Sequence, residues 1–180
     1  KLVADTKNVG WWMWDKQVVT GAVPPTRIKF GLVSLGGGDA LLFGGLVPPA
    51  YSDTNTLVDN DTWIFTFGSG RWTKVVGTAG PTGRSSPLMC SLGPGKILVY
   101  GGYSQGGFPP KFDSWIFDVS SAQQWTQVTT IDLSVGDYFY SPVLSSFGPG
   151  RAFFYGGPST NAASTMPSIW IFDASNSGAK

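Results

Sequence analysis

Hydrophobic positions along the chain fall into short runs, and a turn containing glycine or proline separates each run from the next. The runs are rich in Val, Ile, Phe, Tyr and Trp, a composition that favours β-strands. No window of ten or more residues has apolar positions at helical spacing without an intervening Gly or Pro. The pattern therefore predicts an all-β chain.

A Trp-x-aromatic motif occurs four times in these runs, at near-constant distance along the chain. Its copies begin at Trp12, Trp63, Trp115 and Trp170, so successive copies are 51, 52 and 55 residues apart. Regular self-similarity at such a period indicates a repeat architecture, in which each copy is one supersecondary unit.

Two glycine signals share this period. A glycine-rich turn ends at Gly38, Gly95 or Gly150, and a diglycine begins six residues later. In the two Gly-Pro-Gly turns, proline fixes φ at the first central position, and we expect the next glycine to adopt a positive φ. We expect the diglycines to allow close backbone packing where inner strands converge.

Each period predicts four antiparallel strands. The first is expected at residues 30–35, 87–92 and 142–147, and the second is the apolar run that ends at the diglycine. The third is the Trp-x-aromatic segment, and the fourth carries a second tryptophan, Trp72 or Trp125. In the first, partial period the fourth position, residues 16–20, has no tryptophan. A repeated four-stranded unit of about 50 residues is typical of a β-propeller blade, because stacked blades cover one another's faces.

These motifs resemble the kelch repeat over most of the chain, from about Gly10 to Asp173. That family has an apolar strand ending in Gly-Gly, a variable loop, an Asn-Asp-x-Trp-x-Phe-Asp strand and a second Trp about ten residues on. Residues 60–65 and 113–118 match the aromatic strand. The resemblance implies that residues 1–180 are one segment of a kelch-type propeller, with blades of four antiparallel strands.

The family's arginine before the first strand is matched by Arg27 and Arg84, each 17 residues before its diglycine. The third period departs from the pattern, with Phe139 at the arginine position and Ser168 where Asp61 and Asp113 stand in the other periods. Kelch-like propellers close with more blades than this span holds. The span is therefore expected to be an incomplete ring, completed by further blades from the same chain or another chain.

The charge and hydrophobicity of the chain limit the kinds of partner that we expect. The formal net charge is +1 and only 13% of residues are charged, so no basic surplus favours a nucleic-acid partner. No apolar run reaches the ~18–20 residues of a membrane span, and we expect none. The low content of Lys and Glu, together with many Thr, Ser, Gly and Trp residues, favours an extracellular or cell-surface location over the alternative, the cytoplasm.

Kelch-type propellers include galactose-oxidase-like copper radical enzymes, and the resemblance would imply two Tyr and two His ligands with a Tyr–Cys crosslink. The chain contains no histidine, so we expect no such copper site, no other metal or cofactor, and no catalytic residue in this span. The single cysteine, Cys90, is expected to be a small buried apolar residue. One alternative is that the span belongs to a secreted or surface enzyme whose catalytic residues lie elsewhere.

Binding is the function that the sequence favours. Loops between the second and third strands of a unit vary most, and propeller loops carry ligand sites while blades act as scaffold. We therefore predict a non-enzymatic interaction or structural module for a protein or glycan partner. The candidate binding residues are Tyr51, Arg84, Tyr103, Gln105, Phe108, Lys111 and Tyr138. The alternative is that these side chains pack under their own loops.

Two further possibilities follow from the same segments. Asn60, Asp61 and Thr62 form a glycosylation sequon, although the aromatic strand motif itself has Asn-Asp at this place. The unfinished ring also suggests a subunit of an extracellular assembly in which blade edges of different chains meet.

Overall fold

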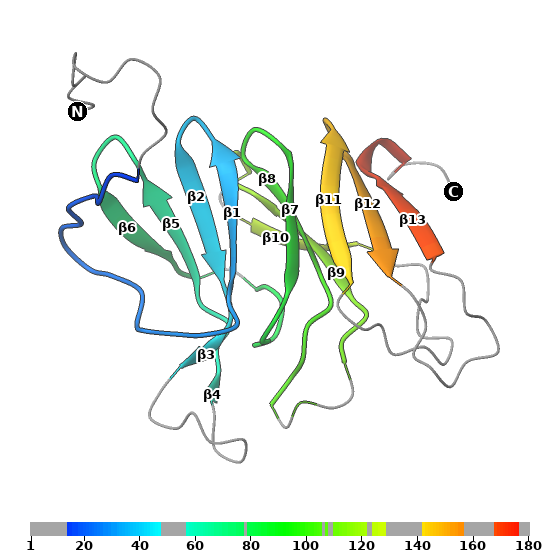
Figure 1. Ribbon diagram of the computed structural model, residues 1–180, viewed down its shortest axis with the longest axis horizontal. Coiled ribbons are helices and arrows are strands. Elements are labelled where there is room, and N and C mark those ends of the chain that lie inside the picture. Colours follow the sequence, from blue (N-terminus) through cyan, green and yellow to red (C-terminus); the bar gives the residue numbers. More distant parts are fainter. Residues whose placement is uncertain are drawn as a thin grey trace.

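Three antiparallel β-sheets stand side by side, like the blades of a fan (Figure 1). The structure is a computed structural model that describes residues 14–47, 57–77, 79–105, 107, 110–121, 124–128, 142–156 and 168–176. Within these ranges the only helical element is one 3₁₀ turn, Ala174–Asn176. The predicted all-β class is confirmed.

The first two blades have four strands each, in the predicted order. The first blade contains β1 (Gly31–Gly36), β2 (Asp39–Phe43), β5 (Thr62–Thr66) and β6 (Arg71–Val75). The second contains β7 (Leu88–Gly93), β8 (Lys96–Tyr100), β9 (Ser114–Asp118) and β10 (Gln124–Val128). The first strand of each blade begins and ends one residue later than predicted.

The third blade has three strands within the described residues. They are β11 (Val143–Gly148), β12 (Arg151–Gly156) and β13 (Ser168–Asp173). A small hairpin of β3 (Leu46–Val47) and β4 (Leu57–Val58) extends the loop between β2 and β5.

The partial period at the start of the chain differs from the expected pair of strands. Residues 16–20 contain no strand, and their backbone meets the first blade through a hydrogen bond from Thr20 N to Gly70 O, at 3.3 Å. The strand that would pair with this segment contains Trp12, which lies outside the described residues. Residues 16–20 run as an irregular, strand-free stretch beside β6 (Figure 1).

Apolar side chains between neighbouring blades form two cores. The larger core joins Leu41, Phe43 and Ile64 of the first blade to Val99, Phe117 and Trp125 of the second. The indole of Trp125 lies 5.1 Å from the ring of Phe43 and 5.0 Å from that of Phe117. The smaller core joins the second and third blades through the buried residues Cys90, Leu92, Leu98 and Ala152. Cys90 is buried there, as predicted.

The glycine turns adopt the expected backbone and also connect the blades. Gly95 and Gly150 have φ of 73° and 71°, in the region that the Gly-Pro-Gly turns predicted. Gly95 N donates to Leu35 O of the preceding blade at 2.9 Å, and Gly150 N donates to Leu92 O at 2.6 Å. The same turn thus makes the same inter-blade hydrogen bond twice.

The diglycines lie where backbone segments approach closely, between the first two blades at Gly44 and within the second blade at Gly102. Gly44 has a φ of 69°, and a Cβ atom there would lie 2.5 Å from Arg84 O. Gly102 has a φ of 93°, and a Cβ atom there would lie 2.8 Å from Ser85 O. A side chain at either position would therefore collide with backbone, which confirms the expectation of close packing.

Candidate binding surface at the loop end of the blades

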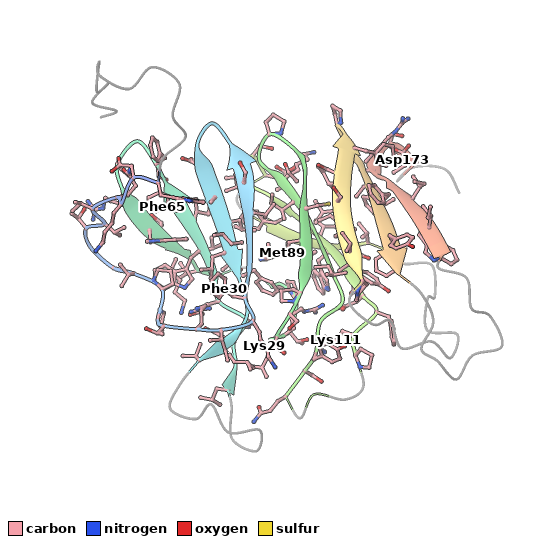
Figure 2. All side chains as sticks on the ribbon, viewed as in Figure 1. Lys29, Phe30, Phe65, Met89, Lys111 and Asp173 are labelled. Atoms are coloured by element: carbon pink, nitrogen blue, oxygen red, sulfur yellow. The ribbon has the colours of Figure 1, made fainter. Side chains whose placement is uncertain are left out.

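Two long loops leave the blades at the same end of the array. The β2–β5 loop with its small hairpin and the β8–β9 loop both project below the sheets in Figure 1, opposite the turns that join β1 to β2 and β7 to β8. Figure 2 shows Lys29 and Lys111 at this loop end and Asp173 at the opposite end. Two of the loops predicted to vary most thus leave the sheets at one end of the molecule.

A buried arginine closes the base of the β8–β9 loop. Arg84 is fully buried, and its Nη1 donates to Gly101 O, where the loop begins, at 3.0 Å. The guanidinium also donates to both carboxylate oxygens of Asp113, where the loop ends, at 2.6 and 2.9 Å. Its Nε donates to Thr82 O. One side chain therefore connects the two ends of a loop of about a dozen residues.

Arg27 repeats this arrangement in the first blade. Its Nη1 donates to Gly44 O at 2.9 Å, and its Nη2 lies 3.1 Å from the Asp59 carboxylate. Gly44 and Asp59 again mark the two ends of a loop. The 17-residue spacing from arginine to diglycine is thus the sequence separation of one repeated hydrogen bond, which both copies form.

The carboxylate partners of the two arginines are not at equivalent positions. Asp61 matches Asp113 in the sequence repeat, but Asp61 pairs with Lys74 at 2.7 Å, and Asp59 pairs with Arg27. In the second blade Asp113 also accepts a hydrogen bond from Trp115 Nε1 at 2.7 Å. The equivalent indole N–H of Trp63 is buried and has no hydrogen-bond partner in the described part of the chain.

Electrostatics at Asp113 favour the charged carboxylate. Burial alone would raise its pKa, but hydrogen bonds from Arg84 and Trp115, together with the positive charge of Arg84, outweigh burial and lower the pKa. Asp113 is therefore ionised at neutral pH and forms a charge-assisted pair with the guanidinium.

Arg84 also links the first two blades through its backbone. Gly45 N donates to Arg84 O at 2.9 Å, and Arg84 N donates to Asp59 O at 3.2 Å. The sequence had placed Arg84 among the candidate surface binding residues. The structure places it beneath the loops instead, because all of its side-chain surface is used by contacts within the blades.

The remaining candidates divide by position. Gln105 is exposed, whereas Tyr103 and Lys111 are half-buried. The backbone of Tyr103 exchanges two hydrogen bonds with Ser85, and Lys111 N donates to Gly102 O. The β8–β9 loop therefore brings these three residues together on one short, anchored segment. Tyr51, Phe108 and Tyr138 lie outside the described residues.

Asn60 is exposed just before β5, where an attached glycan would have room. The third residue of its sequon, Thr62, is buried, and its hydroxyl accepts a hydrogen bond from Trp125 Nε1 at 3.2 Å. Thr62 thus has a packing role whether or not the sequon is used.

Two residues with unusual backbone lie at the same end and were not singled out from the sequence. Lys29 and Ser86, each two residues after an arginine, have positive φ angles of 54° and 51°. Ser86 N donates to Lys29 O at 2.7 Å, which joins the first two blades. Lysine and serine do not favour a positive φ, so the residue type gives no indication of this conformation. Only the repeated position, two residues after each arginine, could have predicted it.

The described residues offer little enclosed space for a small ligand. A small cavity of about 110 Å³ lies between the first two blades, lined by Asn60, Asp61, Thr62, Val75, Gly80, Pro81 and Trp125. Ligand pockets are commonly about 300–1,000 Å³, so the exposed loops are the better candidate for binding. The described residues hold no cluster of three or more metal-binding side chains, and none of their helical segments has the length and hydrophobicity needed to cross a membrane.

The chain is similar to a curated plant protein and to many solved structures. No family model matches it. It is 27% identical over 145 residues to Adagio-like protein 3 of Oryza sativa subsp. japonica, a similarity that covers 72% of this chain and 22% of that protein.

Similar solved structures support the fold. A structure of YjhT matches 83% of this chain and 50% of its own, with a TM-score of 0.60 and 16% identity. A fungal alcohol oxidase of the AA5 family, in complex with copper, matches 82% of this chain and 31% of its own, with a TM-score of 0.59 and 18% identity. A RAG complex with one melted and one unmelted RSS matches 88% and 50%, with a TM-score of 0.58 and 15% identity. The chain therefore spans about a fifth of the rice relative and at most half of these structures.

Proposed function

We propose that this chain is part of a kelch-type β-propeller that acts as a non-enzymatic interaction module, with a protein or glycan bound at the loop end of the blades. The observation that carries the proposal is the pair of hydrogen bonds by which Arg84 joins Gly101 to Asp113. Arg27 joins the two ends of the neighbouring loop through one hydrogen bond to Gly44 O and an ion pair with the Asp59 carboxylate. Both loops are thereby displayed from a buried, charge-paired base.

Anchoring the loop bases favours binding because less conformational freedom is lost when a partner docks. The β8–β9 loop presents an amide at Gln105, a phenol at Tyr103 and an ammonium group at Lys111. Such amphipathic and hydrogen-bonding groups on a weakly charged surface suit protein and carbohydrate partners. No surplus of positive charge supports a nucleic-acid partner.

A direct test uses the whole chain, labelled with biotin, against a printed glycan panel and a displayed peptide library. We expect reproducible binding to one ligand class, and at least a tenfold loss in the Tyr103→Ala, Gln105→Ala, Lys111→Ala triple variant. The matched control is Lys96→Ala, which removes an exposed lysine from the opposite end of the same blade. Absence of any binder, or equal loss in both variants, would contradict the proposal.

An alternative function is supported by the similarity to the copper-containing alcohol oxidase. Under this alternative, the blades are the scaffold of an enzyme whose catalytic residues lie outside residues 1–180, because residues 1–180 contain no histidine. Elemental analysis of the longer protein tests it. One transition-metal ion per molecule would favour the enzyme over the binding module.

We propose an extracellular or cell-surface location, with the cytoplasm as the alternative. Support comes from the low charge content and from the exposed position of Asn60 in its sequon. Intact-mass measurement before and after glycosidase treatment of the natural protein checks this. A glycosidase-sensitive mass on Asn60 would favour the extracellular location, and its absence would favour the cytoplasm.

A further inference from the structure

One side of the third blade exposes large apolar side chains. Val143, Phe147, Tyr155, Ile169 and Ile171 lie on one face of this sheet and are 52%, 48%, 44%, 66% and 57% exposed. We call this set the open face. In the first and second blades the position of Phe147 is occupied by Leu35 and Leu92, which are 5% and 3% exposed. Those two faces are buried because the next blade covers them.

On the opposite side of the array one residue of the first blade, Leu32, is exposed, whereas its cross-strand neighbours Leu42 and Trp63 are buried. Gly31 of the first blade leaves room for Met89 of the second, and a Cβ atom at Gly31 would collide with the Met89 sulfur. Leu144 of the third blade occupies the position of Met89 and packs into the second core. The first blade has Leu32 at this position, and Leu32 is 57% exposed. Gly31 of the first blade contacts Met89 of the second. In the third blade Val143 occupies the position of Gly31, and Leu32 occupies the position of Met89 in the first blade. A further blade interface of the same kind would therefore place Val143 against Leu32.

Backbone groups show the same complementarity. Leu35 O accepts from Gly95 N, and Leu92 O accepts from Gly150 N, each across one blade interface. Both carbonyls belong to a residue at a register shift in the first strand of a blade. Phe147 lies at the equivalent shift, and no inter-blade donor reaches its carbonyl in the described residues. Gly38, equivalent to the two donor glycines, has no hydrogen-bond acceptor for its N–H in those same ranges.

We propose that the open face binds the first blade of a second copy of this chain, head to tail, with Val143 against Leu32 of the partner copy and Phe147 O accepting from Gly38 N of the partner copy. The acceptor, the donor and both apolar surfaces are supplied by this sequence alone. The chain also matches half the length of the YjhT and RAG chains, so two copies supply the length of one such chain. A head-to-tail contact that closes on itself gives a ring of fixed size. This self-association does not involve the loop-end residues of the proposed binding function.

The first experiment measures the molar mass of the chain by light scattering across micromolar to hundred-micromolar concentrations. We expect a concentration-dependent species of twice the chain mass of 19.2 kDa. Phe147→Lys and Leu32→Lys should each weaken dimer formation at least tenfold, because each places a charge in a buried apolar contact. Val76→Lys, at an exposed apolar position beyond the end of β6 that belongs to neither contact pair, is the matched control and should remain dimeric.

Mixing the two lysine variants identifies the geometry. A head-to-tail contact leaves one intact interface between a Phe147→Lys chain and a Leu32→Lys chain, so the mixture should recover a dimer. A variant with Val143→Cys and Leu32→Cys should form intermolecular disulfides on mild oxidation, whereas Val143→Cys alone should not form them at the same rate. This readout does not depend on the stability of the lysine variants.

Three outcomes would overturn the proposal. A monomer at every concentration would mean that another occupant, such as a further blade of a longer chain, covers the open face. A dimer that survives Leu32→Lys would indicate a symmetric contact between two open faces. Loss of the dimer in the loop variant at Tyr103, Gln105 and Lys111 would place the contact at the loop end.

Discussion

Arg84 and Asp113 form an ion pair with two hydrogen bonds, of 2.6 and 2.9 Å, in which the arginine side chain is fully buried and the carboxylate is about a quarter exposed. The pair lies where the β8–β9 loop returns to the sheet, and the backbone of the same arginine is bonded to the first blade. The stability of the second blade and the position of its loop therefore depend on the same contact.

Removing one member of this pair should be costly. We expect Arg84→Met to lower the free energy of unfolding by about 3 kcal/mol, near the low end for breaking a buried pair because Asp113 is partly exposed. Urea unfolding followed by tryptophan fluorescence measures the change. Lys96→Ala is the control, since its pair with Asp118 is at the surface and should contribute about 1 kcal/mol or less. Equal effects of the two substitutions would contradict the assignment.

Acid should weaken the same contact. The pKa of Asp113 is lowered in the folded chain, so its ionised form stabilises the fold above its ordinary pKa of 3.8, and this contribution is lost as pH falls through the lowered value. We expect the urea midpoint of the natural chain to fall more steeply between about pH 5 and about pH 2 than that of Asp113→Asn. Asp118 and Asp173, whose pKa values are also lowered, are present in both chains. Parallel pH profiles would therefore exclude a role for Asp113.

The close approach at Gly44 predicts a strong dependence on residue size. Gly44→Ala places a Cβ atom against Arg84 O and also strains a backbone with positive φ. Gly37→Ala adds only the backbone strain, because no atom lies within 4 Å of its Cβ position. We expect about 1–2 kcal/mol for Gly37→Ala and a clearly larger loss for Gly44→Ala. Urea unfolding of both variants under one set of conditions provides the comparison.

The indole of Trp125 contributes both a hydrogen bond and apolar packing between blades. Trp125→Ala should cost about 3–5 kcal/mol. Thr62→Val, which removes the acceptor hydroxyl with little change in volume, should cost about 1–3 kcal/mol because the indole N–H remains buried. Thr62→Ser keeps the hydroxyl and serves as the control. If Thr62→Ser is as damaging as Thr62→Val, the hydrogen bond is not the cause.

Cys90 should be chemically inert in the folded chain. Burial raises the pKa of its thiol to about 11, so little thiolate is present at neutral or mildly alkaline pH. A thiol-reactive chromogenic disulfide should label the chain slowly under native conditions and at once in concentrated urea. Rapid native labelling would show that the core between the second and third blades opens readily.

The repeat signals allowed most of the fold to be predicted from sequence. The spacing of tryptophans, diglycines and glycine turns predicted the number and order of the strands in the first two blades, and the first strand of each lies within one residue of its predicted bounds. The 17-residue interval before the diglycines was visible for Arg27 and Arg84, but its meaning as a loop-closing hydrogen bond was not. An arginine can close the loop in this way only when its side chain is buried. The sequence does not distinguish a buried arginine from a solvent-exposed one.

Other features depend on three-dimensional competition between neighbours. Asp61 occupies the repeat position of Asp113, but its carboxylate forms an ion pair with Lys74 on the adjacent strand. Arg27 forms its ion pair with Asp59 instead. No sequence alignment of the two periods could show which carboxylate reaches the guanidinium. The same limit applies to Lys29 and Ser86, whose positive φ angles occur where Ser86 N donates to Lys29 O between the first two blades.

The loop closed by Arg84 has a consequence for how such a protein can diversify. Its two ends are fastened to each other at the sheet, so the residues between them can be inserted, deleted or replaced with little effect on the strands. Natural drift and laboratory grafting alike could therefore exchange the segment between Gly102 and Phe112 as a cassette, while the blade beneath retains its shape.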